Sequence, residues 1–240
     1  MEQVIILDRN RQDIGLFTRN PTPGNEHDLV ERFIEYYSSD FKRNNKRNCL
    51  AIFVEPRIDS GFPDMVFATY LPSILDNWSD ERERLDVFDI KLLSYIADVK
   101  TVKGAKIISK LGYPEKQTIT SAEKLMDAKL VTYHSGGWHI RKMHDIFSIT
   151  KLVAVEAKLS DVGKVVDQTF LNTRFASHSY AVLNSTKPHN ETLQTFTKYG
   201  VGLYCRGTPF KKYVEAKQYT LPSCYLSYQF NEWIGKTIAH

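Results

Sequence analysis

The run KLVAVEAK, at residues 151–158, is apolar on both faces through Val155 and then ends on Glu156 and Lys158. A strand without a polar face is typical of the middle of an α/β sheet, where helices cover both sides. Residues two apart in a strand point to the same face. A carboxylate and an ammonium side by side therefore predict that this strand ends at a site. The alternative is a strand end that reaches solvent and carries a weak surface ion pair.

The outer parts of the chain have the pattern of one α/β sheet. Leu29, Val30 and Phe33 recur at helical spacing after the breaker NPTPG, and the compact apolar runs CLAIFV and MVFATY follow as strands. After residue 148 the chain predicts a strand, a helix over 160–177, a strand at 179–183, a helix ended by Gly200, a further strand and an aromatic-rich helix over 224–240.

The middle of the chain has a different texture. A charged segment at 72–86 reads as a linker, and three short helical segments follow at 86–99, 103–112 and 120–131. The spacing of Thr120 and Glu123 predicts a capping box at the start of the third helix. The sequence LVTYHSGGWHIRK then predicts a hairpin around Ser-Gly-Gly. This order of elements, over roughly 86–143, resembles a winged helix-turn-helix. It divides the chain into 1–83, 84–145 and 146–240, with the middle range inserted into the α/β core.

Composition sets few limits. The 240 residues carry a formal net charge of +4 and 42% hydrophobic residues, which suits a globular protein and permits nucleic-acid binding without demanding it. The three cysteines have no metal-ligand spacing and predict a reducing compartment. The sequence contains no signal-peptide core and no apolar run of about 18 residues, so we expect a cytoplasmic protein that spans no membrane.

The two strands that flank the insertion bring acidic residues together if they form an antiparallel hairpin. The start of the first strand then lies opposite the end of the second. Asp64, just before the first strand, would meet Glu156 and Lys158, although 92 positions separate it from Glu156. Neighbouring carboxylates suit Mg²⁺ or Mn²⁺. A bound metal lowers the pKa of water, and a nearby lysine stabilises developing charge, so the trio suits phosphodiester hydrolysis.

The motif GFPDMVF followed by LVAVEAK resembles the PD-(D/E)xK nuclease superfamily, with Pro63, Asp64, Glu156, Ala157 and Lys158 at the motif positions. The resemblance covers about 180 residues. It implies a restriction-endonuclease-like core of αβββαβ order, a mixed central sheet flanked by helices. It also implies Mg²⁺ dependence, Asp64 and Glu156 as metal ligands, and Lys158 as the catalytic lysine.

The same resemblance suggests two further site residues. Glu26, on the helix before the sheet, would complete the metal shell, with Glu31 and Glu35 as rivals, and Gln168 would join from the helix after Lys158. Each has a plainer alternative. Glu26 suits a helix N-terminus as a carboxylate that complements the dipole, and Gln168 suits an ordinary helix surface.

The winged-helix resemblance predicts a DNA-binding surface. The third helix would enter the major groove, and basic residues before it and after the wing would contact phosphates. The predicted set is Lys103, Lys106, Lys116, Thr118, Ser121, Lys124, Arg141 and Lys142. The alternative is that the module docks a partner protein.

Together these features predict a metal-dependent DNA endonuclease acting on duplex DNA, in a restriction, defence, transposition or repair role. Cutting both strands of a duplex usually calls for two sites, which favours a homodimer. Two alternatives remain open: a DNA-binding or regulatory protein whose nuclease-like core is only a scaffold, and a nuclease subunit whose winged helix binds another protein.

Overall fold

A computed structural model describes residues 2–239, which divide into two compact units. The first unit comprises residues 2–71 and 149–223, and the second comprises residues 72–148 and 224–239. The chain thus leaves the first unit after the predicted strand MVFATY and returns at the start of the predicted strand that ends in VEAK. The boundaries differ from the expected 1–83, 84–145 and 146–240. The larger difference is at the C-terminus, where the last helix belongs to the second unit.

The first unit is built on a mixed seven-stranded sheet, and the protein is of the α/β class. The strand order is β1-β2-β3-β7-β8-β9-β10. The pairs β1–β2, β7–β8 and β8–β9 are parallel, whereas β2–β3, β3–β7 and β9–β10 are antiparallel. The strands are β1 (Val4–Leu7), β2 (Cys49–Val54), β3 (Met65–Tyr70), β7 (Ile149–Lys158), β8 (His178–Leu183), β9 (Gly202–Cys205) and β10 (Lys211–Val214).

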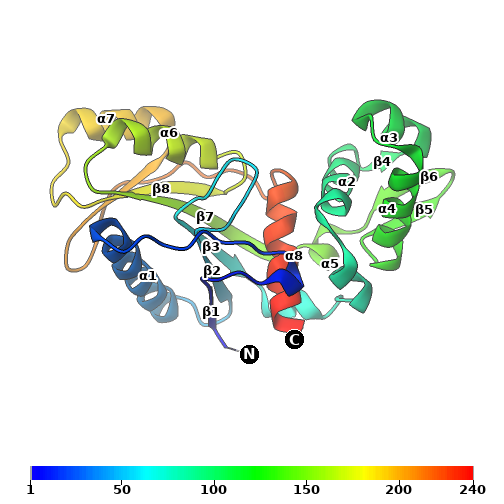
Figure 1. Ribbon diagram of the computed structural model, residues 1–240, viewed down its shortest axis with the longest axis horizontal. Coiled ribbons are helices and arrows are strands. Elements are labelled where there is room, and N and C mark those ends of the chain that lie inside the picture. Colours follow the sequence, from blue (N-terminus) through cyan, green and yellow to red (C-terminus); the bar gives the residue numbers. More distant parts are fainter. Residues whose placement is uncertain (1, 240) are drawn as a thin grey trace. The chain divides into compact units, whose positions relative to one another are not determined.

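Helices cover both faces of this sheet (Figure 1). Helix α1 (Asn25–Asn44) packs its apolar stripe, including Leu29 and Phe33, onto one face, in a core that also contains Val153 and Val155. Helices α6 (Val162–Asn172) and α7 (Asn190–Tyr199) pack onto the other face. Helix coverage on both sides explains why most of β7 and β8 is buried along its length.

The two edge strands, β1 and β10, were not predicted from the sequence. Each is four residues long, and β10 carries exposed Lys211 and Lys212. Such short segments lack the alternation that identifies a strand and gain their stability from pairing with a neighbour. Helix α6 also ends earlier than the expected 160–177, because residues 173–176 leave the helix in a turn before β8.

The second unit contains the predicted three helices and hairpin. Its elements are α2 (Val87–Val99), β4 (Thr101–Val102), α3 (Gly104–Leu111), α4 (Glu115–Asp127), β5 (Val131–His134), β6 (Gly137–Ile140), α5 (Met143–Ile146) and α8 (Tyr225–Ala239). The strands form a small sheet of order β4-β6-β5. Ser135 and Gly136 both have positive φ in the two-residue turn between β5 and β6, as the Ser-Gly-Gly signal predicted.

The predicted start of the third helix was wrong. Helix α4 begins at Glu115, after Pro114, so Thr120 lies inside the helix instead of capping it. Proline fixes its own φ near the helical value and suits a helix start. A capping box is present instead at the start of α2. The Asp86 side chain accepts from the Asp89 backbone N–H, and the Asp89 side chain accepts from the Asp86 backbone N–H.

The charged segment 72–86 is a packed part of the second unit instead of a linker. It contains the short helices η2 (Pro72–Leu75) and η3 (Asp80–Arg84). Arg82 is 1% exposed, and its Nε donates to Glu232 Oε2 of α8 at 3.0 Å while its guanidinium stacks on Trp78. A Cβ added at Gly235 would lie 1.9 Å from the Trp78 ring, so glycine is required where this tryptophan meets α8.

Across residues 2–239, no helix combines the length and the apolar character needed to cross a membrane.

The buried Arg82–Glu232 pair predicts how the second unit responds to mutation. Glu232→Leu leaves a buried guanidinium without its carboxylate, so the second unit should lose about 3–5 kcal/mol of unfolding free energy. Arg82→Met with Glu232→Leu should recover most of that loss, because two apolar side chains need no charge partner. All three tryptophans, Trp78, Trp138 and Trp233, lie in this unit, so urea unfolding followed by tryptophan fluorescence reports on it. A double variant as unstable as the single variant would contradict the prediction.

Candidate functional site

The end of the β3–β7 hairpin brings together the residues that the sequence predicted. Met65 pairs with Val155, which confirms the antiparallel arrangement and sets Asp64 across from Glu156. The backbone N–H of Ala157 donates to Asp64 Oδ2 at 2.7 Å. The two carboxylates, 92 positions apart in sequence, therefore lie at the same end of two neighbouring strands, Asp64 just before β3 and Glu156 near the end of β7.

The pleat of β7 separates its site residues from the α1 core. Val153, Val155 and Ala157 pack in the cluster that contains the apolar face of α1. Because side chains alternate along a strand, Glu156 and Lys158 point to the opposite face. Met65 packs in the α1 cluster as well, so Asp64 shares the face of Glu156.

Glu156 is a buried carboxylate with one satisfied oxygen. It is 2% exposed, and its Oε1 accepts from Asn172 Nδ2 of α6 at 2.7 Å. Its Oε2 is shielded from solvent and has no hydrogen-bond partner among the described residues. An unpartnered buried carboxylate oxygen is costly unless it is protonated or binds a ligand.

The surroundings raise the pKa of both carboxyl groups. Burial raises the pKa of Glu156 to about 8, and the negative charge of Asp64 acts in the same direction. Burial also raises the pKa of Asp64 to about 6, with contributions from Glu26 and Glu55, although the Ala157 N–H and Lys158 oppose the rise. The site therefore disfavours two bare negative charges and favours a cation or a proton between them.

Lys158 and Glu26 form an ion pair at this end of the sheet. The Lys158 side chain is 15% exposed and that of Glu26 is 44% exposed. Burial lowers the pKa of Lys158, but the hydrogen bond with Glu26 and the charge of Asp64 outweigh it, so the pKa lies above its ordinary value. Of the three glutamates considered on α1, Glu26 is the one that contacts the site. Glu31 pairs with His27, and Glu35 is exposed beside another cavity.

Asn172, which the sequence analysis missed, makes the α6 contact with Glu156. Gln168 lies four residues earlier, on the same face of α6. Its Oε1 is shielded and has no partner within the part of the chain that the structure describes. A polar residue one turn after a proposed site glutamine was the signal that could have identified Asn172.

The sequence analysis also missed an ion pair between Arg19 and Glu55, which lies close enough to Asp64 and Glu156 to feel their charges. Arg19 donates to the Glu55 carboxylate, and its guanidinium lies 5.5 Å from the centre of the Phe62 ring. The hydrogen bond with Glu55 raises the pKa of Arg19, and the charges of Asp64 and Glu156 add to that rise. The segment that carries Arg19 is fixed by backbone bonds to residues 55 and 57.

The oxygen atoms that the site offers are chemically suited to bind a divalent cation. Asp64 and Glu156 offer carboxylate oxygens on one face, one of them without a partner, and such oxygens are the preferred ligands of Mg²⁺. Over residues 2–239, no group of three or more His, Cys, Asp or Glu side chains is arranged to hold a metal ion. Glu26, the proposed third ligand, pairs with Lys158.

The predicted DNA-binding residues of the second unit divide into two groups. Thr118 and Ser121 are each 2% exposed on α4, so they face the core of the unit and the prediction that they read bases is wrong. Helix α4 starts five residues earlier than expected, so the outward-facing positions were assigned to the wrong residues. Lys103, Lys106, Lys116 and Lys142 are exposed, and Arg141 is half-buried.

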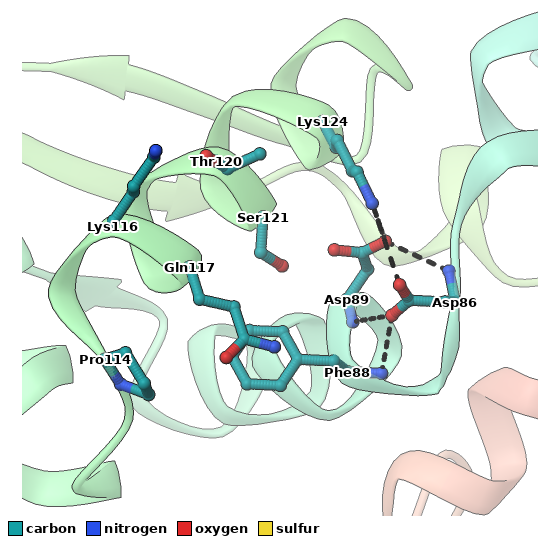
Figure 2. A pocket seen from close by; sticks show the side chains of 9 residues that line it. All are labelled: Asp86, Phe88, Asp89, Pro114, Lys116, Gln117, Thr120, Ser121 and Lys124. Carbon is teal, nitrogen blue, oxygen red and sulfur yellow. Dashed lines mark hydrogen bonds and ion pairs between the residues drawn. The ribbon is translucent and has the colours of Figure 1, made fainter.

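Lys124 is engaged within the unit. Its Nζ donates to Asp89 Oδ2 at 3.1 Å and lies 3.7 Å from Asp86 Oδ2. Figure 2 shows this contact at one side of a pocket that Phe88, Gln117 and Ser121 also line. Two acidic neighbours offset the charge of Lys124, which makes it a weaker phosphate contact than the exposed lysines.

No protein-family profile, curated protein or solved structure matches this chain.

The raised pKa of Glu156 predicts that the first unit loses stability as pH rises. The unfolded chain loses this proton near pH ~4.3, whereas the folded protein keeps it to about pH 8. Between these values the folded state binds more protons, so unfolding free energy falls with rising pH, by at most about 1.4 kcal/mol per pH unit for one group. Glu156→Gln keeps the acceptor for Asn172 and removes the titration, so it should flatten this slope between pH 6 and 8.

Calorimetry in EDTA at several pH values measures the effect, and tryptophan fluorescence identifies the transition of the second unit. A Glu156→Gln variant with the same pH dependence as the wild type would contradict the assignment.

Proposed function

We propose that this chain is a metal-dependent endonuclease that hydrolyses phosphodiester bonds in DNA. The observation that carries the proposal is the site at the end of the β3–β7 hairpin. There Asp64 and Glu156 are buried on one face with an unpartnered carboxylate oxygen, and Lys158 lies at the end of the same strand.

The topology of the first unit supports the proposal. The order α1, β2, β3, β7, α6, β8 is the αβββαβ order that the resemblance to PD-(D/E)xK nucleases implies. The strands β2, β3 and β7 form an antiparallel meander, and β8 is parallel to β7. Asp64 precedes the second of these core strands and Glu156 and Lys158 end the third.

Asp64 and Glu156 would hold the metal ion, with Glu26 as a third ligand if its pair with Lys158 opens. A bound Mg²⁺ or Mn²⁺ would supply a water of lowered pKa and neutralise charge on the scissile phosphate. Its positive charge would also stabilise the ionised form of both carboxyl groups, against the burial and repulsion that raise their pKa.

The protein groups have distinct tasks in this scheme. The Ala157 N–H and the Asn172 amide hold Asp64 and Glu156 in fixed orientations. Lys158 would orient the attacking water and stabilise the negative charge that develops on the phosphate. Asn172 is a positioning residue, because it acts through Glu156.

The second unit has the element order of a winged helix, with β5 and β6 as the wing, and we assign it a DNA-binding role. Exposed Lys103, Lys106 and Lys116 and the residues after the wing would contact phosphates. A partner protein is the second candidate, favoured by the exposed apolar side chains Ile119 and Met126 on α4.

Lys158→Ala should reduce cleavage of plasmid DNA by about 10²–10³-fold in the presence of Mg²⁺, because it removes a donor for the developing charge. Asp64→Asn should abolish cleavage, and EDTA should abolish cleavage by the wild type. Lys164→Ala, which removes an exposed lysine from α6, is the matched control and should retain activity. A wild-type protein that binds DNA without cutting it in Mg²⁺ or Mn²⁺ would favour the scaffold role instead.

A further inference from the structure

A concave surface of the first unit lies at the same end of the sheet as the proposed site, on the face that α1 covers. Its volume is ≈ 630 Å³, compared with ≈ 420 Å³ for the pocket of Figure 2. Residues of α1 and of the loop between β9 and β10 line it, among them Arg32, Tyr36, Arg206 and Phe210. Its volume is within the range of about 300–1,000 Å³ that is typical of small-molecule sites.

The cavity and the proposed site share one end of the sheet. Lys158 pairs with Leu183, and Leu183 pairs with Cys205, so the parallel strands β7, β8 and β9 end together. The Asn184 N–H donates to the Lys158 carbonyl at 3.2 Å, and Arg206 Nη1 donates to Asn184 Oδ1 at 3.1 Å. Two strand spacings, about 10 Å, separate Lys158 from the start of the loop that carries Arg206.

The charges that line the cavity suit a phosphate. Arg32 and Arg206 are exposed, and neither forms an ion pair within residues 2–239. Arg206 is oriented by the neutral amide of Asn184, which leaves its charge uncompensated. Glu35 also lines the cavity, so the three charged side chains sum to +1. Arginine guanidinium groups bind phosphate oxygens through paired N–H donors.

The aromatic wall suits a base. Tyr36 is half-buried, and its ring is held by Phe210 and Phe33, at centroid distances of 5.4 and 5.8 Å. Phosphate contacts alone would need only exposed cations. A hollow with a fixed aromatic ring can also take an unpaired base by stacking, whereas the bases of an intact duplex are already stacked on one another.

We propose that this cavity receives an unpaired nucleotide of the DNA strand next to the scissile phosphate, with its phosphate at Arg206 and Arg32 and its base against Tyr36. This inference rests on the proposed nuclease function and narrows the substrate class. The preferred DNA has unpaired nucleotides beside the cut, as an overhang or flap does, in place of a continuous duplex.

The test is fluorescence anisotropy in EDTA, so that binding is measured without cleavage. The probes are a blunt duplex and the same duplex with a short single-stranded overhang. Arg206→Ala and Tyr36→Leu should each weaken binding of the overhang DNA by about tenfold, and blunt-duplex binding by less than about twofold. Arg174→Ala is the matched control. It removes an exposed arginine that follows α6 and precedes β8, at the opposite end of the sheet, and should change neither affinity.

Equal losses on both DNAs, no loss on either, or no DNA binding by the wild type would each overturn the nucleotide site. Because Arg206 is exposed, its variant should fold normally, and its thermal unfolding midpoint checks this. The experiment distinguishes a failure of the nucleotide site from a failure of the proposed nuclease function. Cleavage in Mg²⁺ without an overhang preference removes only the nucleotide site, whereas an overhang preference without cleavage removes only the nuclease activity.

Discussion

The pairing of β3 with β7 is the constraint on which the rest of the first unit depends. The two strands are adjacent in the sheet, yet residues 72–148 separate them in sequence. Their register sets Asp64 across from Glu156 and leaves Met65 and Val155 in the α1 core. A slip of one residue would turn every side chain of a strand to the other face and bury Glu156 against α1. The apolar residues of β7 thus fix the position of its charged ones.

The buried carboxylates of the site lower the stability of the folded first unit. Two carboxylates are held in a poorly solvated position. The Ala157 N–H supports Asp64 and Asn172 supports Glu156 Oε1, whereas Glu156 Oε2 has no partner among the described residues. A fold selected for stability alone would place an apolar or neutral side chain at position 156. Lys158 supplies one positive charge but is itself shared with Glu26. This combination of burial, like charge and incomplete hydrogen bonding is characteristic of functional sites.

The sequence predicted those parts that depend on local pattern and strand pairing. The buried strands, the interruption between residues 71 and 149, the wing turn and the meeting of Asp64 with Glu156 all followed from apolar runs and turn residues. The contacts from Asn172 and Arg19 depend on how a helix and a loop pack, which a pattern of residues does not specify. For Thr118 and Ser121 the error came from helix phase. A start misplaced by five residues rotates the expected outward face, because successive helical residues differ by about 100°.

The second unit is made from two stretches of chain, and this has a consequence for the order in which the protein can be completed. The segment with Trp78 and Arg82 is synthesised early, but α8, which carries Glu232 and Gly235, is translated after every strand of the first unit. Until α8 emerges from the ribosome, the Arg82 guanidinium has no carboxylate and Trp78 has no glycine to pack on. The inserted region is therefore not a cassette that could be moved alone between proteins. A transplant would have to carry both stretches.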